Sequence, residues 1–140
     1  MSSSVNAELR RDILPVLLLA YALASLVHFT HNAELIRDYP GMPPTWTRSG
    51  VYLAWLGVTL VGMTGWTLVS RGYRLVGLGV LGAYAALGLD SLGHYALAPV
   101  SAHSAGMNGT ILVEVTAAGL VLLEVARQLV IDARRRNPHG

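Results

Sequence analysis

Long apolar segments separated by short polar ones dominate the chain. Mostly apolar runs cover residues 13–35, 50–69, 75–97 and 108–131. Each run is close to the roughly 20 residues that an α-helix needs to cross the hydrocarbon core of a bilayer. Prolines at positions 40, 43 and 44 follow the first run. They end the predicted helix, because proline cannot continue one. The pattern predicts an all-α protein, an integral-membrane four-helix bundle that forms a single transmembrane domain over residues 1–140.

The composition supports membrane insertion. Of the 140 residues, 53% are apolar and 13% are charged, with a mean hydropathy of +0.48, whereas soluble domains carry about 25% charged residues. Four spans leave no room for a soluble catalytic domain. The absence of cysteine excludes disulfides, Cys-ligated zinc and iron–sulfur centres.

The arginines predict the orientation of the spans. Eight would share one side of the membrane, namely Arg10, Arg11, Arg71, Arg74, Arg127, Arg134, Arg135 and Arg136, and only Arg37 and Arg48 the other. By the positive-inside rule both termini are expected in the cytoplasm, and we expect a bacterial inner-membrane location. Arg10 and Arg11 before an apolar stretch also fit the outline of a signal peptide, but we expect a retained helix. The arginines flank apolar runs, so no nucleic-acid partner is expected.

Polar residues within the predicted spans indicate a site near the outer side. At about 1.5 Å per residue, His28, Asp90 and Glu114 lie at one depth, roughly 20–25 Å from the cytoplasmic boundary. His31 and Asn32 follow His28 at helical spacing, and His94 follows Asp90 by four residues, which predicts shared helix faces. Polar groups are costly in a bilayer and therefore mark functional sites.

Imidazole and carboxylate groups without thiolate suit a transition metal, here iron, zinc or copper. The expected metal ligands are His28, His94, His103, Asp90 and Glu114. We expect Asp90, Glu114 and His31 to act in acid–base catalysis, and Asn32, Asn108 and Trp55 to surround the bound group.

These residues favour a membrane metalloenzyme whose site faces the periplasm and which acts on a lipid-like or small apolar substrate. Three alternatives stay open. His28 and His94 could hold a b-type haem for electron transfer; the same pocket without metal could serve an acid–base isomerase; and the small chain could be an accessory subunit of a larger membrane complex.

A purely structural interpretation is also open for each polar residue. His31 and His103 could be interfacial groups, and Asp90 or Glu114 could form hydrogen bonds that lock helices together. Small residues along the third run, including Gly79, Ala83 and Ala86, permit close helix packing. We therefore expect, besides the lipid bilayer, a second copy or another subunit as a partner.

Overall fold

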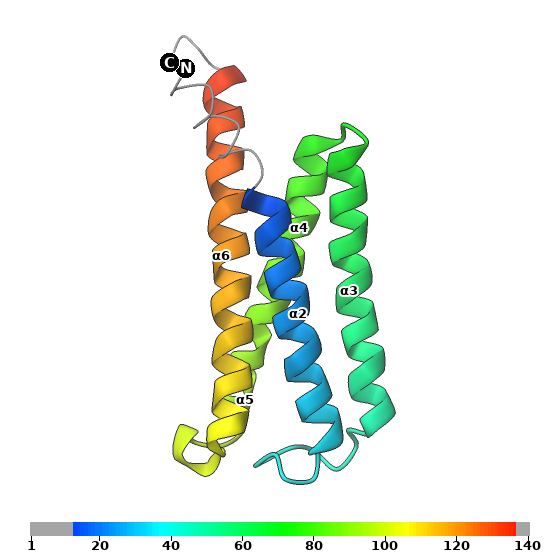
Figure 1. The fold of residues 1–140 in the computed structure, drawn as a ribbon, viewed down its shortest axis with the longest axis vertical. Helices are drawn as coiled ribbons and strands as arrows, with labels where there is room; N and C mark the ends of the chain where they lie inside the picture. The colour runs from blue at the N-terminus through cyan, green and yellow to red at the C-terminus, as the bar shows by residue number, and fades with distance from the viewer. Residues whose placement is uncertain (1–12, 137–140) are drawn as a thin grey trace.

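The computed structural model describes residues 13–136, which form an all-α bundle (Figure 1). Its elements are α2 (Ile13–Glu34), α3 (Arg48–Ser70), α4 (Arg74–Leu89), the 3₁₀ turn η1 (Asp90–Gly93), α5 (His94–Leu97), the 3₁₀ turn η2 (Val100–Ala102) and α6 (Ala105–Arg136). Four segments are long and apolar enough to span a membrane: α2, α3, the stretch from α4 through α5, and α6. The four-helix bundle of candidate membrane spans is thereby confirmed. Arg10 and Arg11 lie outside the described residues.

The two long loops place the helices antiparallel (Figure 1). Helix α3 begins at Arg48 because the Thr47 hydroxyl accepts a hydrogen bond from the Gly50 backbone N–H at 3.1 Å, which caps the helix. It ends before Gly72, whose φ of 89° is a conformation that glycine adopts without strain. The start of α2, the α3–α4 turn and the end of α6 therefore lie at one end of the bundle.

The hydrophobic core lies between α2, α4 and α6. Its buried members are Leu14, Tyr21, Leu78, Leu81, Tyr84, Ala85, Ala118, Val121 and Val125. Helix α3 packs chiefly on α4 and buries only Val51, Gly62 and Gly65. Figure 1 shows α3 on the flank of the bundle opposite α6. Most of the α3 surface is consequently free to face lipid.

The third span runs from Arg74 to Leu97, close to the expected 75–97, but its helix tightens into the 3₁₀ turn η1 at Asp90–Gly93. The Asp90 backbone N–H donates to the Leu87 carbonyl, an i−3 bond of the 3₁₀ type. A 3₁₀ helix turns about 20° more per residue than an α-helix, so four residues change the facing side by about 80°. Asp90 lies two residues after buried Gly88 and is exposed, and the tighter turn brings His94 onto the buried face together with Ser91.

Polar contacts tie the helices together at both ends of the bundle. At the end where α4 begins, Arg74 Nε lies 2.7 Å from Asp132 Oδ2 of α6. At the opposite end, Glu34 Oε1 accepts from Arg48 at 2.9 Å and from the Tyr52 hydroxyl at 2.7 Å, which joins α2 to α3. The spans therefore pair at their boundaries as well as through the core.

Gly88 of α4 makes room for the side chain of Tyr21 of α2. A Cβ there would fall inside contact distance of the Tyr21 hydroxyl. That hydroxyl donates to the Tyr84 carbonyl oxygen at 3.1 Å, and the two tyrosine ring centroids lie 4.4 Å apart. The missing side chain thus makes room for a buried tyrosine pair.

Gly88→Ala is expected to destabilise the bundle by about 1–3 kcal/mol, because overpacking displaces Tyr21 from its hydrogen bond. The control is Gly79→Ala, since a Cβ at Gly79 meets no atom within 4 Å and alanine favours helix. Reversible unfolding in detergent measures both variants. Equal stability of the two variants would contradict this packing.

Candidate functional site

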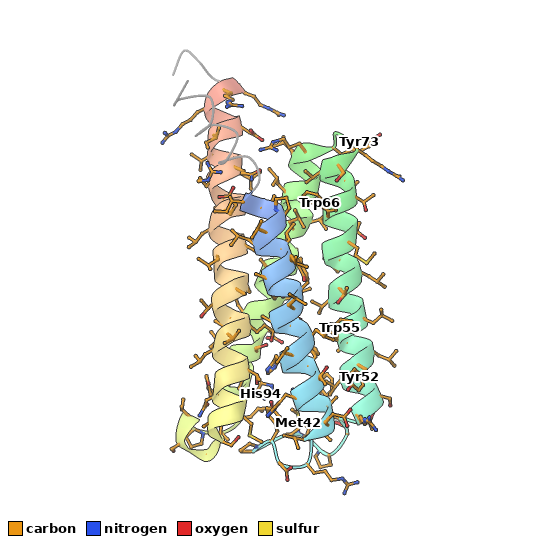
Figure 2. All side chains as sticks on the ribbon, in the orientation of Figure 1. Met42, Tyr52, Trp55, Trp66, Tyr73 and His94 are labelled. Carbon is orange, nitrogen blue, oxygen red and sulfur yellow. The ribbon has the colours of Figure 1, made fainter. Side chains whose placement is uncertain are left out.

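A group of buried polar side chains lies at the end of the bundle away from the α3–α4 turn. It comprises His28 and Asn32 of α2, Ser91 of η1, His94 of α5, His103 of the following loop, and Thr110 and Glu114 of α6; we call these residues the polar cluster. Figure 2 labels His94 near this end. Three membrane-spanning segments and one loop therefore contribute to the cluster.

The centre of the polar cluster is a contact between His28 and Glu114. His28 Nε2 lies 3.7 Å from Glu114 Oε2, and the two side chains are 2% and 0% exposed. The Ser91 hydroxyl donates to the same carboxyl oxygen. Oxygen Oε1 of Glu114 has no hydrogen-bond partner among the described residues. One carboxyl oxygen is therefore held by the protein and the other is available.

Hydrogen bonds to neighbouring residues limit the protonation states that His28 and Glu114 can adopt together. The Thr110 hydroxyl donates to the Met107 carbonyl at 3.1 Å, so it accepts from His28 Nδ1, 3.3 Å away. Nδ1 then carries a proton, and Nε2 faces Glu114. A lone pair facing a carboxylate would be unfavourable, so either Nε2 or the carboxyl group carries a further proton. Both arrangements leave the pair with no net charge, which suits an apolar interior.

His94 and His103 form a second layer of the polar cluster. Asn32 Nδ2 lies 3.1 Å from His94 Nε2, which makes Nε2 the acceptor and places the proton of neutral His94 on Nδ1. His103 Nδ1 donates to the Pro99 carbonyl at 3.1 Å, so its Nε2 keeps a lone pair. His94 Nδ1 and His103 Nε2 are both buried without a partner among the described residues. The ring centroids are 6.3 Å apart, so one donor and one acceptor lie on neighbouring rings.

Asn108 holds the loop that carries His103. Its Oδ1 accepts from the Tyr95 hydroxyl at 2.9 Å, and its Nδ2 donates to the carbonyls of Val100 and His103, both at 3.2 Å. Asn108 was expected to surround a bound group, and the structure instead shows it fastening the loop against the start of α6.

Most of the expected site residues come together, and four, including Asn108, do not. His28, His94, His103, Asn32 and Glu114 all belong to the polar cluster. Asp90 is exposed and does not share the buried face of His94. His31 is half-buried, and Trp55 of α3 is likewise half-buried, with its indole N–H unpaired among the described residues.

The sequence analysis did not single out two residues at the site, Ser91 and Tyr39. Ser91 follows buried Gly88 by three residues, so the helical period of α4 places it on the buried face. Tyr39 comes from the loop after α2, where its hydroxyl lies 2.9 Å from His31 Nδ1 and its ring centroid 5.0 Å from that of His94. Burial raises the pKa of Tyr39, which keeps its hydroxyl protonated at neutral pH.

The arrangement does not match the expected metal site. Within residues 13–136, no three His, Asp or Glu side chains are placed so that they could hold a metal ion. The hydrogen bonding explains part of the mismatch. A nitrogen that binds a metal must be deprotonated, whereas the free nitrogen of His94, Nδ1, carries a proton.

A haem between His28 and His94 does not fit either. Their ring centroids are 5.5 Å apart in an edge-to-face contact. Axial histidines bind iron from opposite faces of the macrocycle, and two rings in contact leave no space for it.

Comparison of the chain with family models, with curated proteins and with solved structures found no match. The function is therefore inferred from the chain's own residues.

Asn108→Ala is expected to release the loop around His103, since three hydrogen bonds of about 0.5–1.5 kcal/mol each are lost. His103 is 6% exposed in the folded chain, and its reaction with an imidazole-modifying reagent should become about tenfold faster or more. Mass spectrometry of the modified peptides measures this.

Tyr95→Phe serves as the graded control, because it removes only one of these bonds. His28, buried between α2 and α6, should stay unmodified in both variants. Unchanged modification of His103 in Asn108→Ala would contradict the role of Asn108.

Proposed function

We propose that this four-span membrane protein is an acid–base enzyme, of the isomerase type, whose reacting groups are Glu114 and His28. The substrate is apolar and lipid-like, since the site is enclosed by membrane-spanning helices. The observation that carries the proposal is the buried contact of His28 Nε2 with Glu114 at 3.7 Å, together with the carboxyl oxygen Oε1 that has no partner among the described residues.

A pair of this kind provides what general acid–base catalysis needs. Ser91 and Thr110 fix the orientation of the two groups through hydrogen bonds, so that a proton can pass between them without movement of the helices. Oxygen Oε1 of Glu114 can accept a proton from one carbon of a bound substrate. His28 supports the charge change, because it can take up or release the proton at Nε2.

The proposed reaction balances without a co-reactant. The enzyme removes a proton from one carbon of an unsaturated substrate, the double bond shifts, and a proton is returned to another carbon. The carboxyl group ends in its starting state, and no electrons leave the substrate.

A transition-metal site is a second candidate, favoured by one observation. His103 Nε2 is a buried imidazole nitrogen with a free lone pair, which is an unusual condition unless something binds it. Binding would require the His94 ring to turn and lose its proton at Nδ1. Elemental analysis of the purified protein tests this candidate directly.

Solvent deuterium should enter the substrate if the acid–base proposal is correct. Purified protein in vesicles made from a bacterial membrane lipid extract is incubated in D₂O, and the lipids are analysed for added deuterium by mass spectrometry. Glu114→Gln and His28→Gln should each lower incorporation by about 100-fold or more, the usual contribution of a general acid or base.

Glu124→Gln is the matched control, because Glu124 is also a buried glutamate of α6 but pairs with Arg127 at 2.6 Å, far from the polar cluster. Incorporation that persists in Glu114→Gln would overturn the proposal. Stoichiometric metal, with incorporation lost on chelation, would favour the second candidate.

We also propose that both chain ends face the cytoplasm and the polar cluster faces the outside. The described arginines support this, because Arg71, Arg74 and Arg127 lie toward one end of the bundle and Arg37 and Arg48 at the other, and cytoplasmic loops are enriched in positive charge.

A reporter fused to the C-terminus should therefore be active in the cytoplasm, and reporters inserted at Gly41 or Ser104 should be active outside. Reversed activities would place the polar cluster on the cytoplasmic side.

A further inference from the structure

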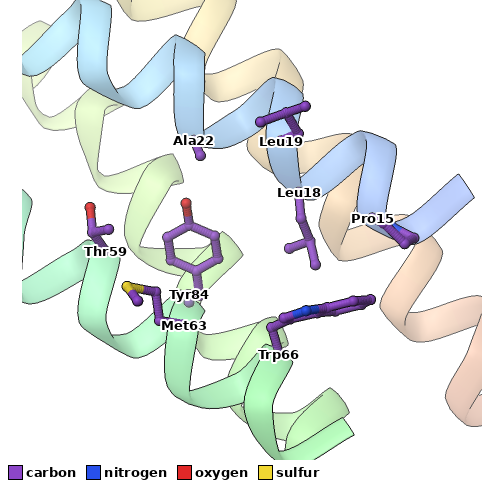
Figure 3. A pocket seen from close by; sticks show the side chains of 9 residues that line it. Pro15, Leu18, Leu19, Ala22, Thr59, Met63, Trp66 and Tyr84 are labelled. Atoms are coloured by element: carbon purple, nitrogen blue, oxygen red, sulfur yellow. The ribbon is translucent and has the colours of Figure 1, made fainter. Parts of the chain in front are cut away.

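A groove opens on the flank of the bundle between α2 and α3, in the half nearer the α3–α4 turn (Figure 3). Its volume is about 350 Å³, within the usual range for small-molecule sites. Pro15 and Trp66 lie toward one end of it, Met63 forms part of its α3 wall, and Ala22, Thr59 and Tyr84 lie toward the other. It exists because α3 packs on α4 more closely than on α2.

The groove has the volume of a small-molecule site. A single hydrocarbon chain is narrow enough to enter. The groove lies within two candidate spans, where the available small molecules are lipids.

The polar groups of the groove limit which lipid fits. No charged residue lines it, so a charged headgroup would have no partner there. Figure 3 shows the hydroxyl groups of Thr59 and Tyr84 at the same end of the groove. Neither makes a hydrogen bond to another described residue, whereas Thr64 and Thr67 of the same helix donate to backbone carbonyls.

The hydroxyl end of the groove adjoins the polar cluster. Tyr84 packs on Tyr21, and Tyr21 lies on the same buried face of α2 as His28, seven residues and about 10 Å before it along the helix. The tyrosine pair therefore lies where the groove comes nearest to the proposed reaction site.

We propose that the groove binds the hydrocarbon part of a neutral lipid that carries a single small oxygen group, a hydroxyl or a carbonyl, held by Tyr84 and Thr59. This inference rests on the proposed function and gives its substrate class. The chain lies along the groove toward Trp66, and the oxygen-bearing end points toward the polar cluster.

A photoreactive probe tests the groove. The protein is reconstituted in phosphatidylcholine vesicles with a long-chain alcohol that carries a diazirine in its chain, and after illumination the labelled residues are mapped by mass spectrometry. Met63 should carry more of the label than Leu53. Both are side chains of α3 with similar exposure, 61% and 67%, so exposure alone would not produce this difference. A diazirine-bearing phosphatidylcholine should label both residues alike.

Three variants test whether the label marks a site. Ala22→Phe should lower labelling of Met63 about tenfold, because the phenyl ring fills the groove, and Ala20→Phe, on the exposed surface of the same helix, should leave it unchanged. Tyr84→Phe keeps the ring, and it should weaken labelling by the alcohol if the hydroxyl holds the oxygen. Equal labelling of Met63 and Leu53 by the alcohol, or cross-links between two copies through the groove, would overturn the proposal.

Glu114→Gln separates this proposal from the proposed function. It should keep the labelling of Met63 while losing deuterium incorporation. Loss of labelling only in Ala22→Phe, with no deuterium incorporation in any protein, would support the groove and overturn the reaction.

Discussion

The structure depends on one constraint, which is that polar side chains buried in the bundle must find partners on other helices. Neither lipid nor apolar core can accept or donate a hydrogen bond, and an unpaired polar group there is costly. His28 of α2 is paired through Thr110 and Glu114 of α6, and Ser91 joins the third span to the same carboxyl group. These contacts fix the rotation of three spans relative to one another.

The constraint also explains why α3 differs from the other spans. None of its side chains belongs to the polar cluster, and its buried positions are Val51, Gly62 and Gly65. It is tied to α2 at the end where Glu34 meets Arg48, and it leaves a groove farther along. The helix that contributes nothing to the polar cluster is thus the one that borders the groove.

Equal depth along the helices brings together two residues that are far apart in sequence. His28 and Glu114 were expected to lie at the same depth, and the structure places them in contact. Asp90 was expected beside His94 because four residues make about one turn of an α-helix. The backbone changes to a 3₁₀ turn between these two residues, so His94 is buried while Asp90 is exposed.

The sequence by itself determined the number of spans, their approximate bounds and the depth of each polar residue, because hydropathy and a constant rise per residue depend only on the local chain. The tertiary structure decided which atoms pair. The Tyr39 contact with His94 and the donor roles of the imidazoles arise from how elements distant in sequence are rotated against one another. Contacts between helices, such as Gly88 against Tyr21, set that rotation. The spacing of residues along a single helix does not predict such contacts.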